Sequence, residues 1–138
     1  MAYATPRLID ALRRSATDIE TGKAYEWGHM GGCNCGHLVQ NLTQLSRAQI
    51  HTYAMSKGTG DWSEQVEVWC ETSKMDMDLL ISELLSYGLS KEDLIHLELL
   101  NDRQITKRLG RNDLAKNSKH DAALYMRAWA EVLEEQII

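Results

Sequence analysis

Residues 5–22 read TPRLIDALRRSATDIETG, and this stretch predicts the first element of the fold. Thr5 followed by Pro6 indicates a helix start, because a threonine side chain caps free backbone amides and proline fits the first helical position. The apolar residues that follow share one face of a helix and are Leu8, Ile9, Leu12, Ala16 and Ile19. Gly22 ends this pattern. We therefore expect an amphipathic helix of about four turns.

The rest of the chain repeats this arrangement of capped starts and apolar faces. Further helices are expected at residues 37–42, 46–55, 61–70, 74–87, 90–100, 101–109 and 120–136. Ser46 and Ser90 begin capping patterns, Asn101 is expected to cap the helix that follows it, and Gly88 suits a left-handed helix end. The apolar stripe before Gly88 is expected to contain Met75, Leu79, Ile81, Leu84 and Leu85.

No segment alternates apolar and polar residues over the length of a useful strand. The sequence therefore predicts an all-α fold, a single compact domain of six to eight mostly short helices. This domain is expected to span residues 1–138 and to contain a Gly/Cys/His-rich loop at residues 27–37.

Composition favours a soluble protein that folds without crosslinks. The chain has 138 residues and is 43% hydrophobic, and a domain of this length buries roughly two-thirds of its unfolded surface. Three cysteines are an odd number, and no apolar signal segment stands at the start, so we expect a reducing, cytoplasmic setting. No apolar run approaches the roughly 18 residues that a membrane span needs.

Residues 27–37 read WGHMGGCNCGH and carry the clearest functional signal. This segment holds four of the nine glycines, which allow a tight backbone, together with two thiols and two imidazoles. Thiolate and neutral imidazole are preferred ligands of borderline-soft cations. We therefore predict a transition-metal site, with zinc as the first choice and iron or copper as alternatives. Its predicted ligands are His29, Cys33, Cys35 and His37.

Helix geometry restricts how many of these ligands can bind one ion. If a helix begins by Cys35, then Cys35 and His37 point about 200° apart on it. Three local ligands and one distant ligand are therefore favoured over four local ones. The sequence offers Cys70, His96 and His120 for the distant position and does not choose among them.

Two other functions are compatible with the same residues. Cys35 just before a helix would have its thiolate stabilised by free amides, so a thiol-dependent enzyme is one alternative, with His29 or His120 as the base. Buried cysteines and glycines required by backbone geometry are the structural explanation of the same segment.

The second alternative is a helical protein–protein interaction module without a catalytic site. The net charge is −5, but residues 61–102 hold eleven acidic and two basic side chains, whereas residues 103–119 hold six basic and one acidic. Such asymmetry suits a charged protein partner or a homodimer. Aromatic residues are absent from the basic segment, which does not favour nucleic-acid binding.

Overall fold

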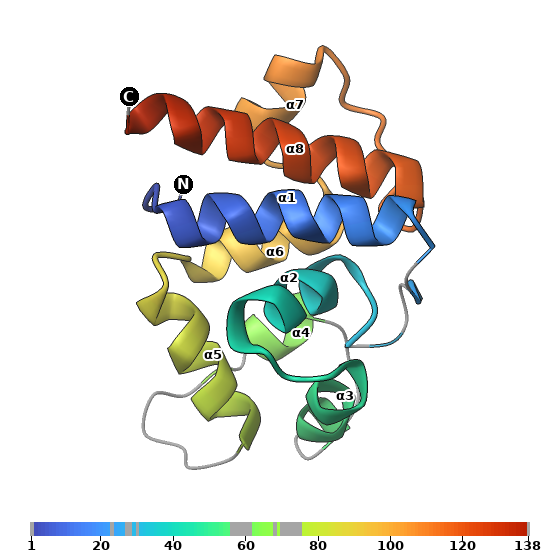
Figure 1. Ribbon diagram of the computed structural model, residues 1–138, viewed down its shortest axis with the longest axis vertical. Coiled ribbons are helices and arrows are strands. Elements are labelled where there is room, and N and C mark those ends of the chain that lie inside the picture. The colour runs from blue at the N-terminus through green and yellow to red at the C-terminus, as the bar shows by residue number, and fades with distance from the viewer. Residues whose placement is uncertain are drawn as a thin grey trace.

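Helices are the regular elements of this computed structural model (Figure 1), which describes residues 2–22, 24–26, 29, 31–55, 62–67, 69 and 76–137. The elements are α1 (Pro6–Glu20), α2 (Asn34–Thr43), α3 (Arg47–Met55), α4 (Trp62–Glu67), α5 (Asp76–Ser86), α6 (Lys91–Leu99), α7 (Arg103–Leu109) and α8 (Lys119–Gln136). No strand occurs within the described ranges, so the predicted all-α class is confirmed. Among the described helices, none combines the length and the apolar character that crossing a bilayer requires.

The α1 and α8 helices form the main packing layer. They lie side by side and run in opposite directions (Figure 1). Leu8, Leu12 and Ile19 of α1 are fully buried, and Tyr125 and Trp129 of α8 are buried beside them, with an edge-on ring contact of 6.4 Å between centroids. Each such side chain contributes roughly 1.5–3 kcal/mol by leaving water. This layer is the frame against which the other helices pack.

Several helix starts have the caps that the sequence predicts. The Thr5 hydroxyl accepts a hydrogen bond from the third amide of α1 at 3.2 Å. Ser46 and Gln49 form a reciprocal pair at the start of α3, with N–H···O distances of 3.1 and 2.8 Å. Ser90 and Asp93 form the same kind of capping box at α6. Local sequence therefore determines these starts, because the capping groups lie within four residues of the amides they satisfy.

The predicted end of α5 is confirmed, whereas the predicted cap of α7 is not. Gly88 has a φ of 101°, the left-handed conformation expected for it. The prediction that Asn101 caps α7 is wrong, because Asp102 holds that position and its carboxylate accepts a hydrogen bond from the Gln104 amide at 2.9 Å. The two residues are adjacent and both are good caps, so propensity alone does not separate them.

The buried face of α5 also differs from the predicted stripe. Leu79 is 57% exposed, although it was expected to face inward. Ile81 and Leu84 are buried as predicted, Leu85 is partly buried, and Met75 lies outside the described residues. The apolar residues buried on this face are Met77, Leu80, Ile81 and Leu84. Their spacing of three and four residues follows one helical face, and position 79 lies about 200° from position 77 on that helix.

The α2 helix is the most enclosed short helix of the fold. It packs against α1, α3 and α6, and the residues from Asn34 to Val39 are all buried. Its start is three residues earlier than predicted, at Asn34 rather than His37. This arrangement places the end of the Gly/Cys/His-rich loop against the last turns of α6.

Candidate functional site

The start of α2 meets a buried carboxylate of α6. The Cys33 thiol donates a hydrogen bond to Glu98 Oε2 at 3.4 Å, and the backbone N–H of Cys35 donates to the same oxygen at 3.4 Å. The Cys35 thiol donates to the Leu94 carbonyl oxygen at 3.1 Å, one turn earlier on α6. All three functional side chains are buried. We call Cys33, Cys35 and Glu98 the thiol–carboxylate cluster.

The position of Glu98 complements the electrostatics of α2. Cys33 is the N-cap residue but makes no side-chain capping bond, and the first turn of α2 carries no acidic residue. The carboxylate of Glu98 supplies from another helix the negative charge that a helix N-terminus favours. Glu98 therefore caps α2 across a tertiary contact.

Asn34 and Tyr25 fix this cluster in place. The Asn34 side-chain amide donates to the Glu98 carbonyl oxygen at 3.1 Å and to the Lys116 carbonyl oxygen at 2.9 Å. The Tyr25 hydroxyl donates to the Asn34 side-chain oxygen at 2.6 Å. Burial first, then the thiol of Cys33, raises the pKa of Tyr25. The loop before α2, the end of α6 and the segment before α8 are thus joined at one buried amide.

The His37 ring lies apart from both thiols. Its Nε2 is 2.8 Å from the Ala24 carbonyl oxygen, and its ring centroid is 6.0 Å from that of Tyr25. A carbonyl oxygen only accepts, so Nε2 carries the hydrogen in this bond and has no lone pair left for a metal. In this arrangement His37 connects α2 to the segment that leaves α1.

The His29 ring stacks on a histidine of α3. The His29 and His51 ring centroids are 3.9 Å apart, with an angle of 20° between the planes. The Gly31 backbone N–H donates to Nδ1 of His29 at 3.2 Å. Burial first, then the charges of His51 and Arg47, lowers the pKa of His29. We call His29 and His51 the histidine pair.

Two glycines allow the loop to approach α3 closely. A Cβ atom at Gly31 would lie 2.0 Å from the Arg47 carbonyl oxygen, and one at Gly32 would lie 2.6 Å from Arg47 Nε. Arg47 also forms an ion pair with Glu26 at 2.7 Å. The glycine content at this point therefore has a packing reason that is independent of any ligand.

The predicted ligands separate into different environments. Cys33 and Cys35 lie together at α6, His37 contacts the carbonyl of Ala24, and His29 stacks on α3. Over the described residues, no group of three or more His, Cys, Asp or Glu side chains is placed to hold a metal ion. The four-ligand set therefore stays a prediction.

The two distant candidates that the structure describes lie apart from the loop, and Cys70 lies outside the described residues. His96 Nδ1 is 3.4 Å from Asp102 Oδ2, and His120 is exposed at the start of α8.

Both loop thiols are protected rather than reactive. Cys33 and Cys35 are 1% and 0% exposed, and burial followed by the charge of Glu98 raises the pKa of Cys33 well above its usual range. Nucleophilic cysteines are accessible and have a lowered pKa. These surroundings favour a packing role for the thiols over nucleophilic catalysis.

Glu98 is the residue of the cluster that the sequence analysis does not single out. The signal was its position four residues after Leu94, which places its carboxylate on the buried face of α6. A charged residue on an apolar helix face rarely becomes fully buried without a bonding partner. The pattern therefore marked Glu98 as unusual, although it did not identify α2 as the partner.

Comparisons with protein-family models, curated proteins and solved structures found no match to this chain.

Proposed function

We propose that this protein binds a transition metal, with zinc as the first choice, through Cys33 and Cys35 and with Glu98 as the third donor. The observation that carries the proposal is the convergence of the Cys33 thiol and the Cys35 amide on Glu98 Oε2, each at 3.4 Å. The Cys33 sulfur contacts the carboxylate, and the Cys35 sulfur lies against the Leu94 carbonyl oxygen, one turn earlier on α6. Sulfur and carboxylate oxygen are both accepted by zinc in tetrahedral sites.

Metal binding would replace the hydrogen bonds that the thiols now make. Both thiols act as donors, so both carry a proton. Zinc binds thiolates, and each sulfur would therefore release its proton as the Zn–S bond forms. The Cys35 sulfur would also have to turn from the Leu94 carbonyl toward Glu98. A fourth position would be filled by water.

The proposal differs from the set predicted by sequence in the third donor. It takes Glu98 from α6 in place of a loop histidine because Glu98 contacts Cys33 and Cys35 directly, whereas the His29 ring stacks on His51. His29 and His37 stay predicted ligands, and the same experiment tests His29. A Cys35 nucleophile and an interaction module also stay predictions, and no contact within the described residues favours either over the metal site.

The test is a zinc titration of the purified, reduced chain in a weak buffer that contains a pH indicator. We expect one zinc ion per chain and about two protons released per ion, because two thiols lose their hydrogens. The variant with Cys33→Ser and Cys35→Ser should bind no zinc at the same concentrations. Glu98→Gln should weaken binding by about tenfold or more, in line with the loss of a ligand or of its immediate support.

His29→Gln is the matched control. The proposal expects it to bind zinc as the wild type does, whereas the four-ligand set expects a large loss. Circular dichroism of each variant without metal checks that the helices are retained. Absence of zinc binding by the folded wild type, or equal binding by the double serine variant, would refute the proposal and leave the thiols as packing residues.

A further inference from the structure

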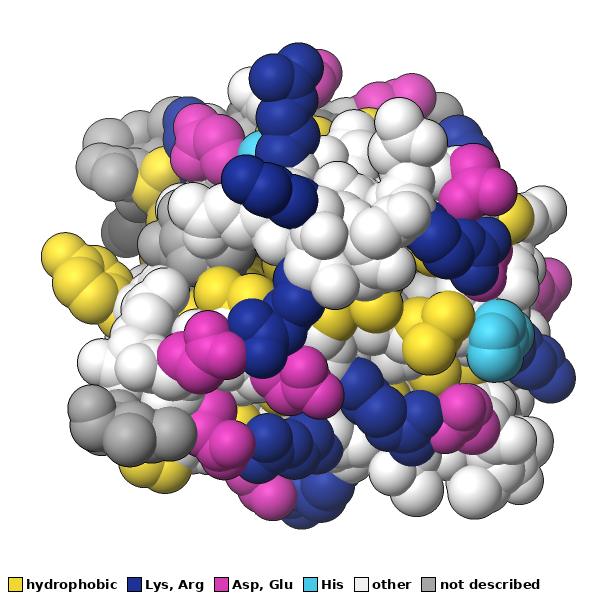
Figure 2. Space-filling model, turned by 90° about the horizontal axis from the view of Figure 1, so that it is seen from above, with side chains coloured by type: hydrophobic (Ala, Val, Ile, Leu, Met, Phe, Trp, Pro, Cys, Tyr) yellow, Lys and Arg dark blue, Asp and Glu magenta, His cyan; other side chains and the backbone are white. Residues whose placement is uncertain are grey.

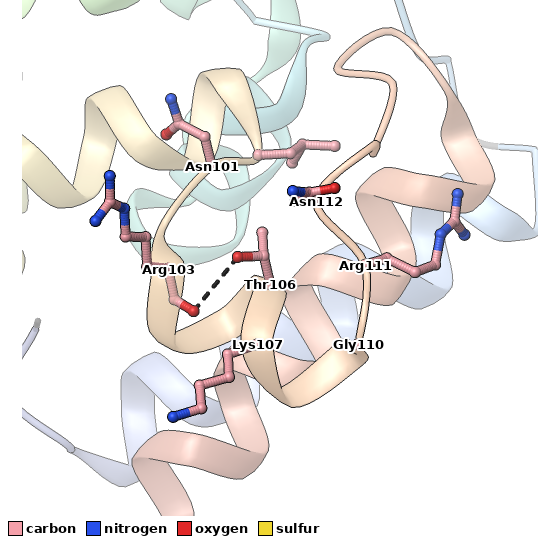
Figure 3. Close-up of a pocket in the computed structure, with 8 residues that line it drawn as sticks. Asn101, Arg103, Thr106, Lys107, Gly110, Arg111 and Asn112 are labelled. Carbon is pink, nitrogen blue, oxygen red and sulfur yellow. Dashed lines mark hydrogen bonds between the residues drawn. The ribbon is translucent and has the colours of Figure 1, made fainter.

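A second feature of interest lies where the chain passes from α6 into α7 and then into the loop before α8. A pocket of about 760 Å³ opens there, within the range of about 300–1,000 Å³ that is typical of small-molecule sites. It is shown in Figure 3, and its lining consists of Leu100, Asn101, Arg103, Thr106, Lys107, Gly110, Arg111 and Asn112. We call it the basic pocket.

The lining of the basic pocket carries positive charge and no negative charge. Three cationic side chains, two amides and one hydroxyl line it, and none of the eight residues is acidic. The surrounding face is different, because Figure 2, which looks onto the end of the molecule formed by α7 and α8, shows basic and acidic side chains intermixed. The lining therefore brings three cationic side chains together on a chain whose net charge is −5, and one of them, Arg111, is paired with Asp113 and Asp121.

The cations of α7 are divided between the pocket and the outer surface. Arg108, which does not line the pocket, is held by Glu131 at 3.1 Å and Glu135 at 2.6 Å. Arg103 and Lys107 line the pocket and have no ion-pair partner among the residues that the structure describes. Their charges therefore face solvent at the opening without a protein carboxylate to neutralise them.

Arg111 supplies the third cation from a more fixed position. Its guanidinium contacts Asp113 at 3.0 Å and Asp121 at 3.6 Å, and Asp121 lies at the start of α8. Figure 3 places Arg103 beside Asn101 on one side of the pocket and Arg111 on the other, with Thr106 between them. The Thr106 hydroxyl donates to the Arg103 carbonyl oxygen at 3.3 Å, which leaves its own oxygen able to accept a hydrogen bond.

We propose that the basic pocket binds a small ligand that carries at least two phosphate groups, such as a nucleoside diphosphate. Separated cations suit a ligand whose negative charge is spread over several oxygens. Arginine is especially suited to phosphate because its planar group donates two parallel hydrogen bonds. The amides of Asn101 and Asn112 would bind the neutral polar part of the ligand. The positive charge of the pocket also attracts such ligands from solution.

The test is a calorimetric titration of the full chain with ADP at low ionic strength. We expect saturable binding with one site per chain, and weaker binding as salt is added, because the contacts are solvent-exposed charges. Adenosine, which lacks phosphate, should not bind. The variant with Arg103→Glu and Lys107→Glu should bind ADP at least about tenfold more weakly, because it loses two charge-assisted contacts and gains repulsion.

The matched control is the variant with Lys91→Glu and Lys119→Glu. It changes the net charge by the same amount at exposed helix starts that do not line the pocket. ADP should bind it within about twofold of wild type. Equal losses of ADP affinity in both variants would mean that only the net charge matters, and this would overturn the proposal. It would also be overturned if ADP did not bind, if adenosine bound equally well, or if a short single-stranded oligonucleotide alone bound through Arg103 and Lys107.

Discussion

The Gly/Cys/His-rich loop has a cysteine half, Cys33 and Cys35, and a histidine half, His29, and the two lie in different parts of the molecule. Cys33 and Cys35 enter the interior and meet Glu98 of α6. His29, only four residues before Cys33, stays half-buried and stacks on His51 of α3. One half is therefore bonded to a carboxylate in the core, and the other contacts a half-buried imidazole ring.

This difference shows that closeness along the chain is a weak guide to convergence in space. The turn at Gly31 and Gly32 packs onto Arg47, and α2 begins immediately afterwards. The turn carries the histidine side toward α3, and the helix carries the cysteine side toward α6. The two halves should consequently respond differently to substitution and to pH.

Glu98→Ala should give the largest effect, because it removes the carboxylate that the cysteine half contacts. We expect a loss of about 3 kcal/mol in the free energy of unfolding, because the Cys33 thiol and the Cys35 amide would be left without their acceptor and a cavity would remain. Urea denaturation in the presence of a chelator measures this loss without any contribution from metal.

Glu98→Gln is the control for this prediction. It keeps the shape and one acceptor oxygen, so we expect a smaller loss of about 1 kcal/mol. If the alanine variant were as stable as wild type, the role of Glu98 as the cap of α2 would be wrong.

Gly31→Ala should give the next largest effect and acts at the boundary between the two halves. The new Cβ would lie 2.0 Å from the carbonyl oxygen of Arg47, a backbone atom that cannot move without shifting α3. We expect a loss of about 2 kcal/mol, within the range for overpacked sites. Thermal unfolding followed by circular dichroism provides the measurement.

Gly32→Ala is a matched substitution one residue away. Its Cβ would meet the side chain of Arg47 at 2.6 Å, and a flexible side chain can move more cheaply than backbone. The loss should be less than half of that for Gly31→Ala. Equal losses would mean that the glycines serve general loop flexibility rather than a close approach to α3.

The predictable part of the fold is the part determined by neighbouring residues. Thr5 caps α1, Ser46 pairs with Gln49, and Gly88 adopts the left-handed conformation, as the sequence indicates. One error arises where two neighbouring residues compete for one role, because Asp102 rather than Asn101 caps α7. The others concern where α2 begins and which face of α5 is buried.

The candidate site was predictable only in its residue types. The sequence indicates that Cys33 and Cys35 lie at a helix start, and they do. It does not reveal that Glu98 lies against that start, because the contact joins residues more than sixty positions apart. The stacking of His29 on His51 is likewise a consequence of how α3 packs against the loop. Contacts of this kind depend on tertiary packing, which local patterns do not encode.

The smallest predicted effect concerns the pH dependence of stability and belongs to the histidine half. The pKa of His29 is lowered from its ordinary value of 6.5, first by burial and then by His51 and Arg47. The unfolded chain therefore takes up a proton at a higher pH than the folded chain does. The contribution of neutral His29 to the free energy of unfolding is fully present above about pH 7. It is lost as the pH falls through 6.5 toward the lowered pKa.

Replacing this histidine should flatten that dependence. We expect His29→Gln to lose less stability than wild type between about pH 7.5 and pH 5, as measured by urea denaturation at each pH. The difference should largely persist at high salt, because burial is its main cause and salt screens only the contributions of neighbouring charges. If the two curves were parallel at low and high salt, His29 would be solvated like an ordinary surface histidine. His29 would then not be desolvated, and the contrast between the buried cysteine half and a partly desolvated histidine half would not hold.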